Sequence, residues 1–337
     1  MLAKPYGTVA PPLASGGDLA YGRSSMASAV LLTLGARGSP LSLAQARETR
    51  RRLALAHGWD EAQIAISVIR TSGDLIQDRP LSEAGGKGLF TKEIDSALLD
   101  GRIDFAVHSA KDLPTALPDG VALAGFLPRE DPRDALISAL ADSIAGLPRG
   151  ARLGAASLRR QAQARRLRPD LKVELLRGNV ETRLAKAESG AIDATLLAMA
   201  GLNRLGLTHR ARAALDIDLF LPAVGQGAIA LAARDGDLRT RDALAAINDA
   251  DTATALAAER AFLAELDGSC RTPIAGHARL EDGRLMLRGE VLREDGSERF
   301  EARMSGAPAD AARLGAEAGR ELRGRLPPGV LFAPPLR

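Results

Sequence analysis

The sequence repeats one short construction, which joins an apolar run to a polar or glycine-containing loop and then to a helix-like segment. The construction occurs at residues 30–34 before Ser39 and Pro40, at 152–155 before Ser157, and at 172–176 before the helix that carries Arg183. Serine is a preferred N-cap, and proline is favoured at the first helical position. This alternation of strands and helices predicts an α/β fold in which ligands bind at the carboxyl ends of the strands.

The run Phe105-Ala-Val-His108 ends abruptly in Ser109, Lys111 and Asp112. An apolar strand therefore delivers polar side chains to the edge of the sheet where ligands bind. A lysine next to a carboxylate favours its ionised form, and we predict that Asp112 is the catalytic acid or base. Taken alone, the same residues fit a solvated turn before Pro114 equally well.

Length, charge and cysteine content limit the possible classes of protein. The 337 residues predict two or three domains. Lys and Arg number 45 against 42 Asp and Glu, so the chain as a whole is no polycation for nucleic acid. The single cysteine, Cys270, excludes an internal disulfide and favours a reducing cytoplasm. Four scattered histidines lack the spacing of metal ligands, and no apolar run is long enough for a bilayer, so we expect neither a metal nor a membrane.

Changes in composition indicate three domains behind an N-terminal extension. Residues 1–28 are rich in Gly, Ala, Ser and Pro and are predicted to be disordered, with Met26 as a possible alternative start. The charged segment 128–134 contains two prolines and suits a crossing between domains, and the glycine-rich loop 221–227 suits the return. We predict domain 1 at 29–128 plus 228–246, domain 2 at 133–222, and a smaller α+β domain 3 at 250–337.

Arginines are concentrated where helices begin. Residues 151–169 contain six arginines and no acid, which usually indicates a solvated basic helix face. However, Arg159 and Arg160 fall in a first helical turn, where the helix dipole disfavours cations, so we predict an anionic ligand there. Arg37 and Ser39 make a similar site at the first helix. Three glycines surround Lys87 in the segment 85–90, which we expect to fold over a ligand, although it lacks the Walker spacing.

Eight motifs follow one another along the chain, namely Gly35-Ala-Arg-Gly-Ser-Pro40, Gly85-Gly-Lys-Gly-Leu-Phe90, Val107-His-Ser-Ala-Lys-Asp-Leu-Pro114, Arg129-Glu-Asp-Pro-Arg-Asp134, Ser157-Leu-Arg-Arg160, Leu176-Arg-Gly-Asn179, Leu221-Pro-Ala-Val-Gly-Gln-Gly227 and Gly268-Ser-Cys270. Together and in this order, they closely resemble the porphobilinogen deaminase (hydroxymethylbilane synthase) family. The resemblance implies two periplasmic-binding-protein-like lobes with a third, smaller α+β domain. It also implies the head-to-tail condensation of four porphobilinogen molecules, with loss of ammonia, into hydroxymethylbilane.

The resemblance further implies a dipyrromethane cofactor, held by a thioether to Cys270. Porphobilinogen carries acetate and propionate groups, so the growing pyrrole chain is a polyanion that guanidinium groups hold well. By resemblance, the cofactor-binding residues besides Cys270 are Lys87, Ser109, Lys111, Ser157, Arg159 and Arg160. The substrate-binding residues are Arg37, Ser39, Phe90, Arg177, Arg183, Arg204 and Gln226. Asp112 would stabilise the positive charge that develops on a pyrrole nitrogen and relay protons.

Some of these residues have ordinary alternatives. Phe90 at a helix entry fits a hydrophobic core, and a lone cysteine such as Cys270 is usually a small buried hydrophobe. Ala155 and Ala156 stand where the family pattern leads us to expect hydroxyl residues, which leaves fewer anion donors before Ser157.

Two other functions compete with the enzyme. A solute-binding protein also has two lobes, but it has no need of Asp112 or Cys270. Nucleic-acid binding would rest only on the arginine run, and the 3% aromatic content argues against it. We expect a monomer, because no exposed apolar repeat is evident.

Overall fold

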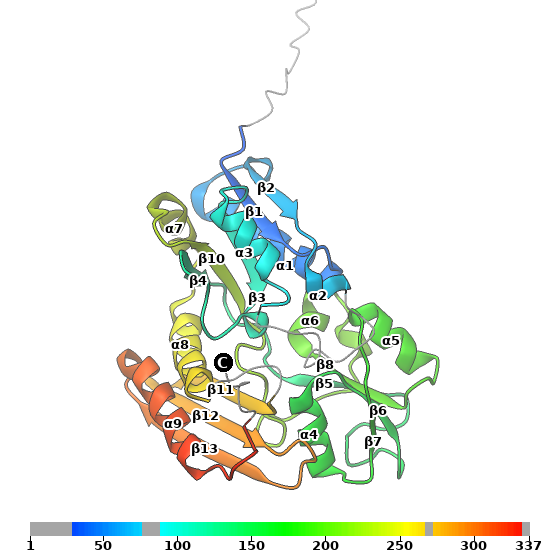
Figure 1. Ribbon diagram of the computed structural model, residues 1–337. Coiled ribbons are helices and arrows are strands. Elements are labelled where there is room, and N and C mark those ends of the chain that lie inside the picture. The colour runs from blue at the N-terminus through cyan, green and yellow to red at the C-terminus, as the bar shows by residue number, and fades with distance from the viewer. Residues whose placement is uncertain (1–28, 76–87, 267–271, 332–337) are drawn as a thin grey trace, which may run out of the picture.

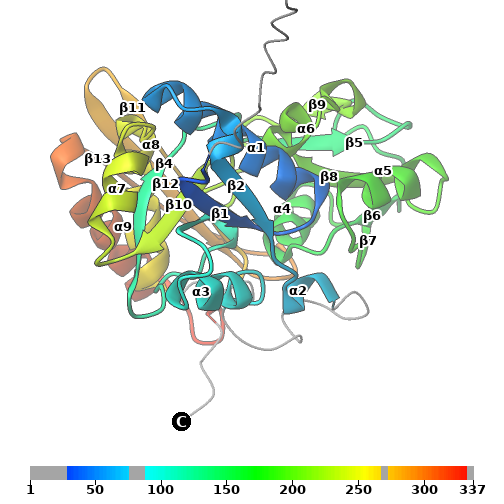
Figure 2. The same cartoon turned by 90° about the horizontal axis from the view of Figure 1, so that it is seen from above.

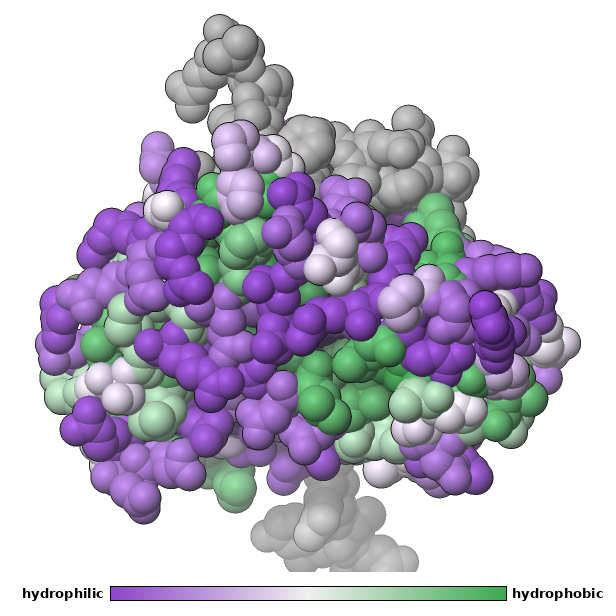
Figure 3. All heavy atoms as spheres, turned by 90° about the horizontal axis from the view of Figure 1, so that it is seen from below, coloured by the Kyte–Doolittle hydropathy of each residue, from purple (hydrophilic) through white to green (hydrophobic). Residues whose placement is uncertain are grey.

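The computed structural model describes residues 29–75, 88–266 and 272–331, which form two α/β lobes and a smaller third domain (Figure 1). This arrangement confirms the predicted fold class. Lobe 2 and the third domain lie side by side below lobe 1 (Figure 1), and the view from above shows them toward opposite ends of the molecule (Figure 2). The face seen from below is mainly hydrophilic, with hydrophobic patches between the polar side chains (Figure 3).

Lobe 1 is a five-stranded sheet in the order β2-β1-β3-β10-β4. Its strands are β1 (Leu32–Ala36), β2 (Ile64–Val68), β3 (Phe105–Ser109), β4 (Val121–Phe126) and β10 (Ile229–Arg234). Its helices are α1 (Pro40–His57), α2 (Ser72–Leu75), α3 (Lys92–Leu99) and α7 (Leu238–Ala245), with 3-10 turns η1 (Glu61–Gln63) and η2 (Ala110–Asp112). Strands β2, β1 and β3 are parallel, whereas β10 returns antiparallel between β3 and β4. The carboxyl ends of β1 and β3 therefore share one edge of the sheet.

Lobe 2 repeats this plan in the order β7-β6-β8-β5-β9. Its strands are β5 (Asp134–Ile137), β6 (Arg152–Gly154), β7 (Lys172–Glu174), β8 (Ala194–Ala198) and β9 (Ala213–Ala214). Its helices are α4 (Leu158–Leu167), α5 (Val180–Glu188) and α6 (Met199–Arg204), with the 3-10 turn η3 (Thr208–Arg210). As predicted, Ser157 caps α4, and Ser39 caps α1 with Pro40 in the first turn.

The third domain packs two helices on one face of a three-stranded antiparallel sheet. It contains α8 (Ala250–Glu265), β11 (Ile274–Glu281), β12 (Arg284–Leu292), β13 (Arg299–Gly306), η4 (Pro308–Asp310) and α9 (Ala311–Arg325). Phe262 of α8 is fully buried against the sheet. A β-carbon on Gly289 would lie 2.2 Å from its ring, so only glycine allows this approach.

The observed elements differ from the predicted ones in a few places. The first strand begins at Leu32 rather than at residue 30. The sequence also predicts a closing helix over about 308–322, and this helix begins at Ala311 because residues 308–310 form a 3-10 turn. Among the described residues, the helices α2 and α7 and the strands β5 and β9 were not predicted, and neither were the 3-10 turns. Strand β5 was missed because its four residues begin with Asp134, at the end of the charged segment taken as a crossing.

The chain passes between the lobes twice, and a buried carboxylate ties both crossings to the third domain. Glu130 N–H donates to the Gly227 carbonyl at 3.2 Å, which joins the two crossings. Glu259 of α8 is fully buried and accepts hydrogen bonds from Arg129, from Gly225 N–H at 2.7 Å and from Ala278 N–H at 2.7 Å. The three parts of the molecule therefore meet at Glu259.

Candidate active site

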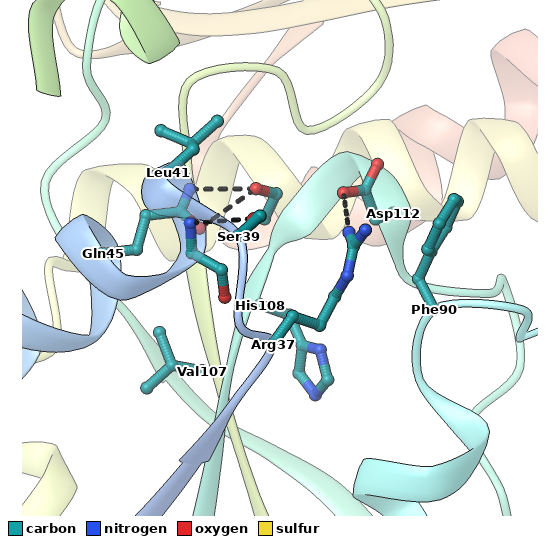
Figure 4. Close-up of a pocket in the computed structure, with 10 residues that line it drawn as sticks. Arg37, Ser39, Leu41, Gln45, Phe90, Val107, His108 and Asp112 are labelled. Carbon is teal, nitrogen blue, oxygen red and sulfur yellow. Dashed lines mark hydrogen bonds and ion pairs between the residues drawn. The ribbon is translucent and has the colours of Figure 1, made fainter. Parts of the chain in front are cut away.

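The strand ends of lobe 1 open on a pocket of about 60 Å³ (Figure 4). Its lining combines the β1–α1 loop, the end of β3 and the entry to α3, and consists of Arg37, Ser39, Leu41, Ser42, Gln45, Phe90, Val107, His108, Ser109 and Asp112. The sequence predicted Arg37, Ser39, Phe90, Ser109 and Asp112 as site residues, and the parallel pairing of β1 with β3 brings these five together.

Asp112 lies on the η2 turn directly after β3. Its Oδ2 is 3.9 Å from Nη1 of Arg37, and about a third of its side chain is exposed. The Arg37 guanidinium lies over the Phe90 ring, 4.2 Å from its centroid, in a cation–π contact. Phe90 therefore packs on a cationic group of the site. The pocket presents a reachable carboxylate beside a positioned guanidinium.

Two neutral residues that the sequence reasoning did not select also shape this pocket. Gln45 of α1 is 4% exposed, and its Nε2 donates to Ser109 Oγ at 2.9 Å, which fixes the serine (Figure 4). His108 is 5% exposed, and its Nε2 has no hydrogen-bond partner among the described residues. Burial, together with the nearby Arg37 charge, lowers the pKa of His108 to about 4, so its imidazole is neutral at pH 7.

Lobe 2 adds cations to the same region. Arg183 lies on the first turns of α5, where its Nε donates to the Gly178 carbonyl at 2.9 Å. Burial lowers the pKa of Arg183 to about 10, with contributions from the Arg160 and Arg177 charges, and Asp112 opposes the shift. Burial likewise lowers the pKa of Lys111 to about 8, and the next largest cause is Arg160. The Asp112 charge acts on Lys111 of lobe 1 and on Arg183 of lobe 2, so cations of both lobes lie near this carboxylate.

A fully buried carboxylate that the sequence reasoning did not select, Asp134, organises the start of α4. Its oxygens accept from Arg159 Nη1 at 2.8 Å, from Arg160 Nε and Nη2 at 2.9 and 2.6 Å, and from Gln226 Nε2 at 3.1 Å. The two guanidinium charges and these hydrogen bonds hold the pKa of Asp134 far below its usual range, although burial acts in the opposite direction. The only sequence signal was an acid directly after Arg133 in a crossing segment.

Several predicted binding residues make hydrogen bonds within the protein, Arg159, Gln226 and Arg204 among them. Arg159 is 4% exposed, and its Nη1 bonds to Asp134, Gln163 and the Leu221 carbonyl. Gln226 is 1% exposed and links Lys111 Nζ, at 3.2 Å, to Asp134.

Arg204 is the third of these residues, and it joins the two lobes. Its Nε donates to Glu48 of α1 at 3.0 Å, and its Nη1 donates to the Gly227 carbonyl at 3.1 Å. Direct contact of Arg159, Gln226 and Arg204 with a ligand stays a prediction, whereas their contacts within the protein indicate positioning roles.

The remaining predictions are placed as follows. Lys87 and Cys270 lie outside the described residues. Ser157 Oγ accepts from Arg160 N–H at 3.4 Å, so its hydroxyl hydrogen stays available to a ligand. Ala155 N–H is bonded to the Glu174 carbonyl at 2.9 Å and does not supply the donor missing at that position.

Neither a membrane span nor a metal cluster is found in the part of the chain that the structure describes. Within residues 29–75, 88–266 and 272–331, no helix is long and apolar enough to cross a membrane. Over the same ranges, no group of three or more His, Cys, Asp or Glu side chains is arranged to hold a metal ion.

Comparison with known proteins gives the same family along nearly the whole chain. Residues 32–242 match the family model described as porphobilinogen deaminase, dipyromethane cofactor binding domain, and residues 253–324 match porphobilinogen deaminase, C-terminal domain. A porphobilinogen deaminase of Nitrobacter hamburgensis is 60% identical over 303 residues, which cover 90% of this chain and 96% of the relative. One of Paracoccus denitrificans is 56% identical over 296 residues, covering 88% and 95%.

Solved structures with a similar course of the chain include periplasmic binding proteins. A periplasmic substrate-binding protein of an ABC transporter from Coxiella burnetii has a TM-score of 0.40 and 14% identity, covering 64% of this chain and 92% of that one. With the family models spanning both lobes and most of the third domain, and relatives more than half identical over almost their full length, the chain belongs to the porphobilinogen deaminase family.

Proposed function

We propose that this protein is a transferase of tetrapyrrole (haem) biosynthesis that condenses four porphobilinogen molecules, with release of ammonia, into hydroxymethylbilane. The observation that carries the proposal is the meeting of one reachable carboxylate, Asp112, with cations from both lobes. Membership of the porphobilinogen deaminase family supports the same activity.

The cations suit a substrate and product that carry many carboxylates. Arg37 and Lys111 come from lobe 1, and Arg160, Arg177 and Arg183 come from lobe 2. Burial is the largest cause of the lowered pKa of Arg183, and repulsion from the neighbouring Arg160 and Arg177 guanidiniums adds to it. An anion bound among them removes that repulsion and can be held bidentately. The cluster therefore fits the acetate and propionate groups of porphobilinogen and of the growing chain.

Asp112 acts on the reacting ring. Each joining step breaks the C–N bond of an aminomethyl group and forms a C–C bond to the α-carbon of the preceding ring, whose proton then leaves. Positive charge develops on the ring nitrogen as ammonia departs, and a carboxylate at that N–H stabilises it. Asp112 also accepts and returns protons during these steps. Arg37 Nη1 lies 3.9 Å from Asp112 Oδ2, which places a guanidinium beside the carboxylate.

The cofactor of this family fits the described residues. A dipyrromethane carries four carboxylates, and the cations around Asp112 together with the Ser157 hydroxyl could hold them. When bound, this group supplies the terminal pyrrole to which the first substrate is joined. We propose a thioether to Cys270 as its covalent anchor and Lys87, Ser109, Lys111, Arg159 and Arg160 as further holding residues. Asp134 holds Arg159 and Arg160 in place by hydrogen bonds, and Gln45 does the same for Ser109.

Replacement of the proposed catalytic carboxylate tests the function directly. Asp112→Asn keeps the size of the side chain and removes the charge, so we expect the rate of bilane formation to fall by about 10²- to 10⁴-fold while the fold is retained. The matched control is Asp119→Asn, an exposed acid of the same lobe, which should keep the parent rate. An Asp112→Asn variant with more than about a tenth of the parent rate would remove Asp112 from the mechanism.

Intact mass tests the cofactor and separates the enzyme from a solute-binding protein. The parent should carry the extra mass of two porphobilinogen-derived rings and react in an Ehrlich-type test for pyrroles, and Cys270→Ser should do neither. If the parent carries no such mass, and porphobilinogen or preformed bilane does not install it, the chain is a binding protein. We also expect a cytoplasmic monomer, which size-exclusion chromatography with light scattering and cell fractionation would check.

A further inference from the structure

The face of the third sheet opposite α8 and α9 carries a group of basic side chains. The strand register places His277 opposite Arg288 and Arg288 opposite Arg303. It likewise places Arg279 opposite Met286, and Met286 opposite Ser305. Residues paired directly across strands project from the same face of a sheet. The alternate residues belong to the core beneath the helices, and two of them, Leu287 and Met304, also reach the cavity described next.

A segment of lobe 2 covers part of this face and leaves a cavity of about 200 Å³. Ile217, Asp218 and Leu221 line it from the lobe 2 side. Arg288 closes one side of the contact, because its guanidinium donates to the Asp218 carbonyl at 3.1 Å and pairs with Asp218 Oδ1 at 3.1 Å. The cavity therefore lies between lobe 2 and the third domain, lined by residues other than those of the active-site pocket.

Two of the arginines at this cavity are held only weakly. Arg279 is paired with Glu281 and Arg303 with Glu301, each two residues away on the same strand. The arginine side chains are 55% and 68% exposed, and ion pairs this exposed contribute about 0–1 kcal/mol. Either guanidinium can therefore turn to a competing anion at little cost.

His277 points to the same conclusion independently. It is 7% exposed and lines the cavity, and its ring makes no hydrogen bond to any residue that the structure describes. Burial lowers the pKa of His277 to about 4, so at pH 7 it offers one N–H donor and one acceptor nitrogen. The ring can therefore exchange hydrogen bonds with a polar ligand in the cavity.

The size and lining of the cavity define the ligand class. An apolar cavity of about 150 Å³ accommodates benzene, so this one has room for a slightly larger molecule. Ile217 and Leu221 supply apolar surface from the lobe 2 side, and Met286 supplies it from the sheet beside the arginines. We propose that the cavity binds a small organic carboxylate of about the size of benzoate, with its apolar part on these three residues and its carboxylate on Arg279 and Arg303. This proposal does not depend on the catalytic function.

Methionine methyl groups allow a direct test on the full-length protein. The chain has five methionines, of which Met286 lines the cavity and Met199, in α6 of lobe 2, does not. With ¹³C-methyl-methionine labelling, and assignment by single Met→Leu variants, titration with benzoate should shift the Met286 signal saturably and leave Met199 in place. The neutral isostere benzamide should bind at least about tenfold more weakly, because it lacks the charge.

The double variant Arg279→Gln/Arg303→Gln should also weaken benzoate binding at least about tenfold, and it should fold because both side chains are more than half exposed. The control is Arg313→Gln, a similarly exposed arginine on α9, which should bind as the parent does. An unmoved Met286 signal, equal shifts with benzamide, or unchanged benzoate affinity in the double variant would each overturn the proposal.

Discussion

Asp134→Asn tests whether the buried carboxylate of lobe 2 holds the two arginines at the start of α4. The carboxylate is 0% exposed, and its four hydrogen bonds come from Arg159, Arg160 and Gln226. Asparagine would leave two guanidiniums buried without a counter-charge. Breaking a buried ion pair by removing one partner costs about 3–5 kcal/mol. We expect a loss of this size in the free energy of unfolding, measured by urea denaturation at pH 7.

The matched control is Asp131→Asn, three residues earlier in the same crossing. Asp131 pairs with Arg133, whose side chain is 43% exposed, so this change should cost no more than about 1 kcal/mol. The difference between parent and Asp134→Asn should also shrink in acid. The folded-state pKa of Asp134 is lowered, so its contribution is complete above the unfolded pKa near 4 and is lost as pH falls below it. Equal costs for the two variants at pH 7 would refute the reasoning.

Three further predictions concern pH, contact between the lobes and backbone shape. The pKa of Lys111 is lowered to about 8, so KM for porphobilinogen should rise as the pH passes 8 and the lysine loses its charge. Lys111→Arg should remove this rise, and the same dependence of KM on pH in the parent and the variant would contradict a role of Lys111 in binding. A double-mutant cycle of Arg204→Gln with Glu48→Gln should give a coupling of about 1 kcal/mol in thermal unfolding, and additive effects would exclude the contact. Gly227→Ala should lower the free energy of unfolding by more than about 2 kcal/mol, because φ is 92° and the new β-carbon would lie 2.3 Å from the Glu130 carbonyl oxygen. Gly236→Ala, which has open space around the new β-carbon, should lower it by less than half as much, and urea denaturation measures both.

Local signals in the sequence were sufficient to predict the elements that carry the site. Ser39 and Pro40 marked the start of α1, Ser157 marked that of α4, and the apolar run ending in Ser109 marked β3. These are short-range preferences of capping, backbone shape and burial, which neighbouring residues express wherever the segment lies. Because β1 and β3 are parallel, their carboxyl ends bring Arg37 and Asp112 to one pocket.

The partners of the charged side chains could not be predicted in this way. Asp134 lies 25 and 26 residues from Arg159 and Arg160, and Gln226 lies 92 residues from Asp134. Nothing in the pattern around an arginine tells whether its counter-charge is a ligand or a distant carboxylate. Arg204 was predicted to bind substrate, and the fold directs it to Glu48 and the Gly227 carbonyl.

The sequence by itself therefore determined the α/β class, the ends of the main helices and the identity of the carboxylate at the end of β3. Only the tertiary structure decided which cations meet that carboxylate, which are neutralised within the protein, and where a second basic cavity forms between lobe 2 and the third domain. The physical reason is the separation along the chain over which each interaction acts. Capping and strand patterns act over a few residues, whereas the ion pairs and cavities depend on packing between segments tens to hundreds of residues apart.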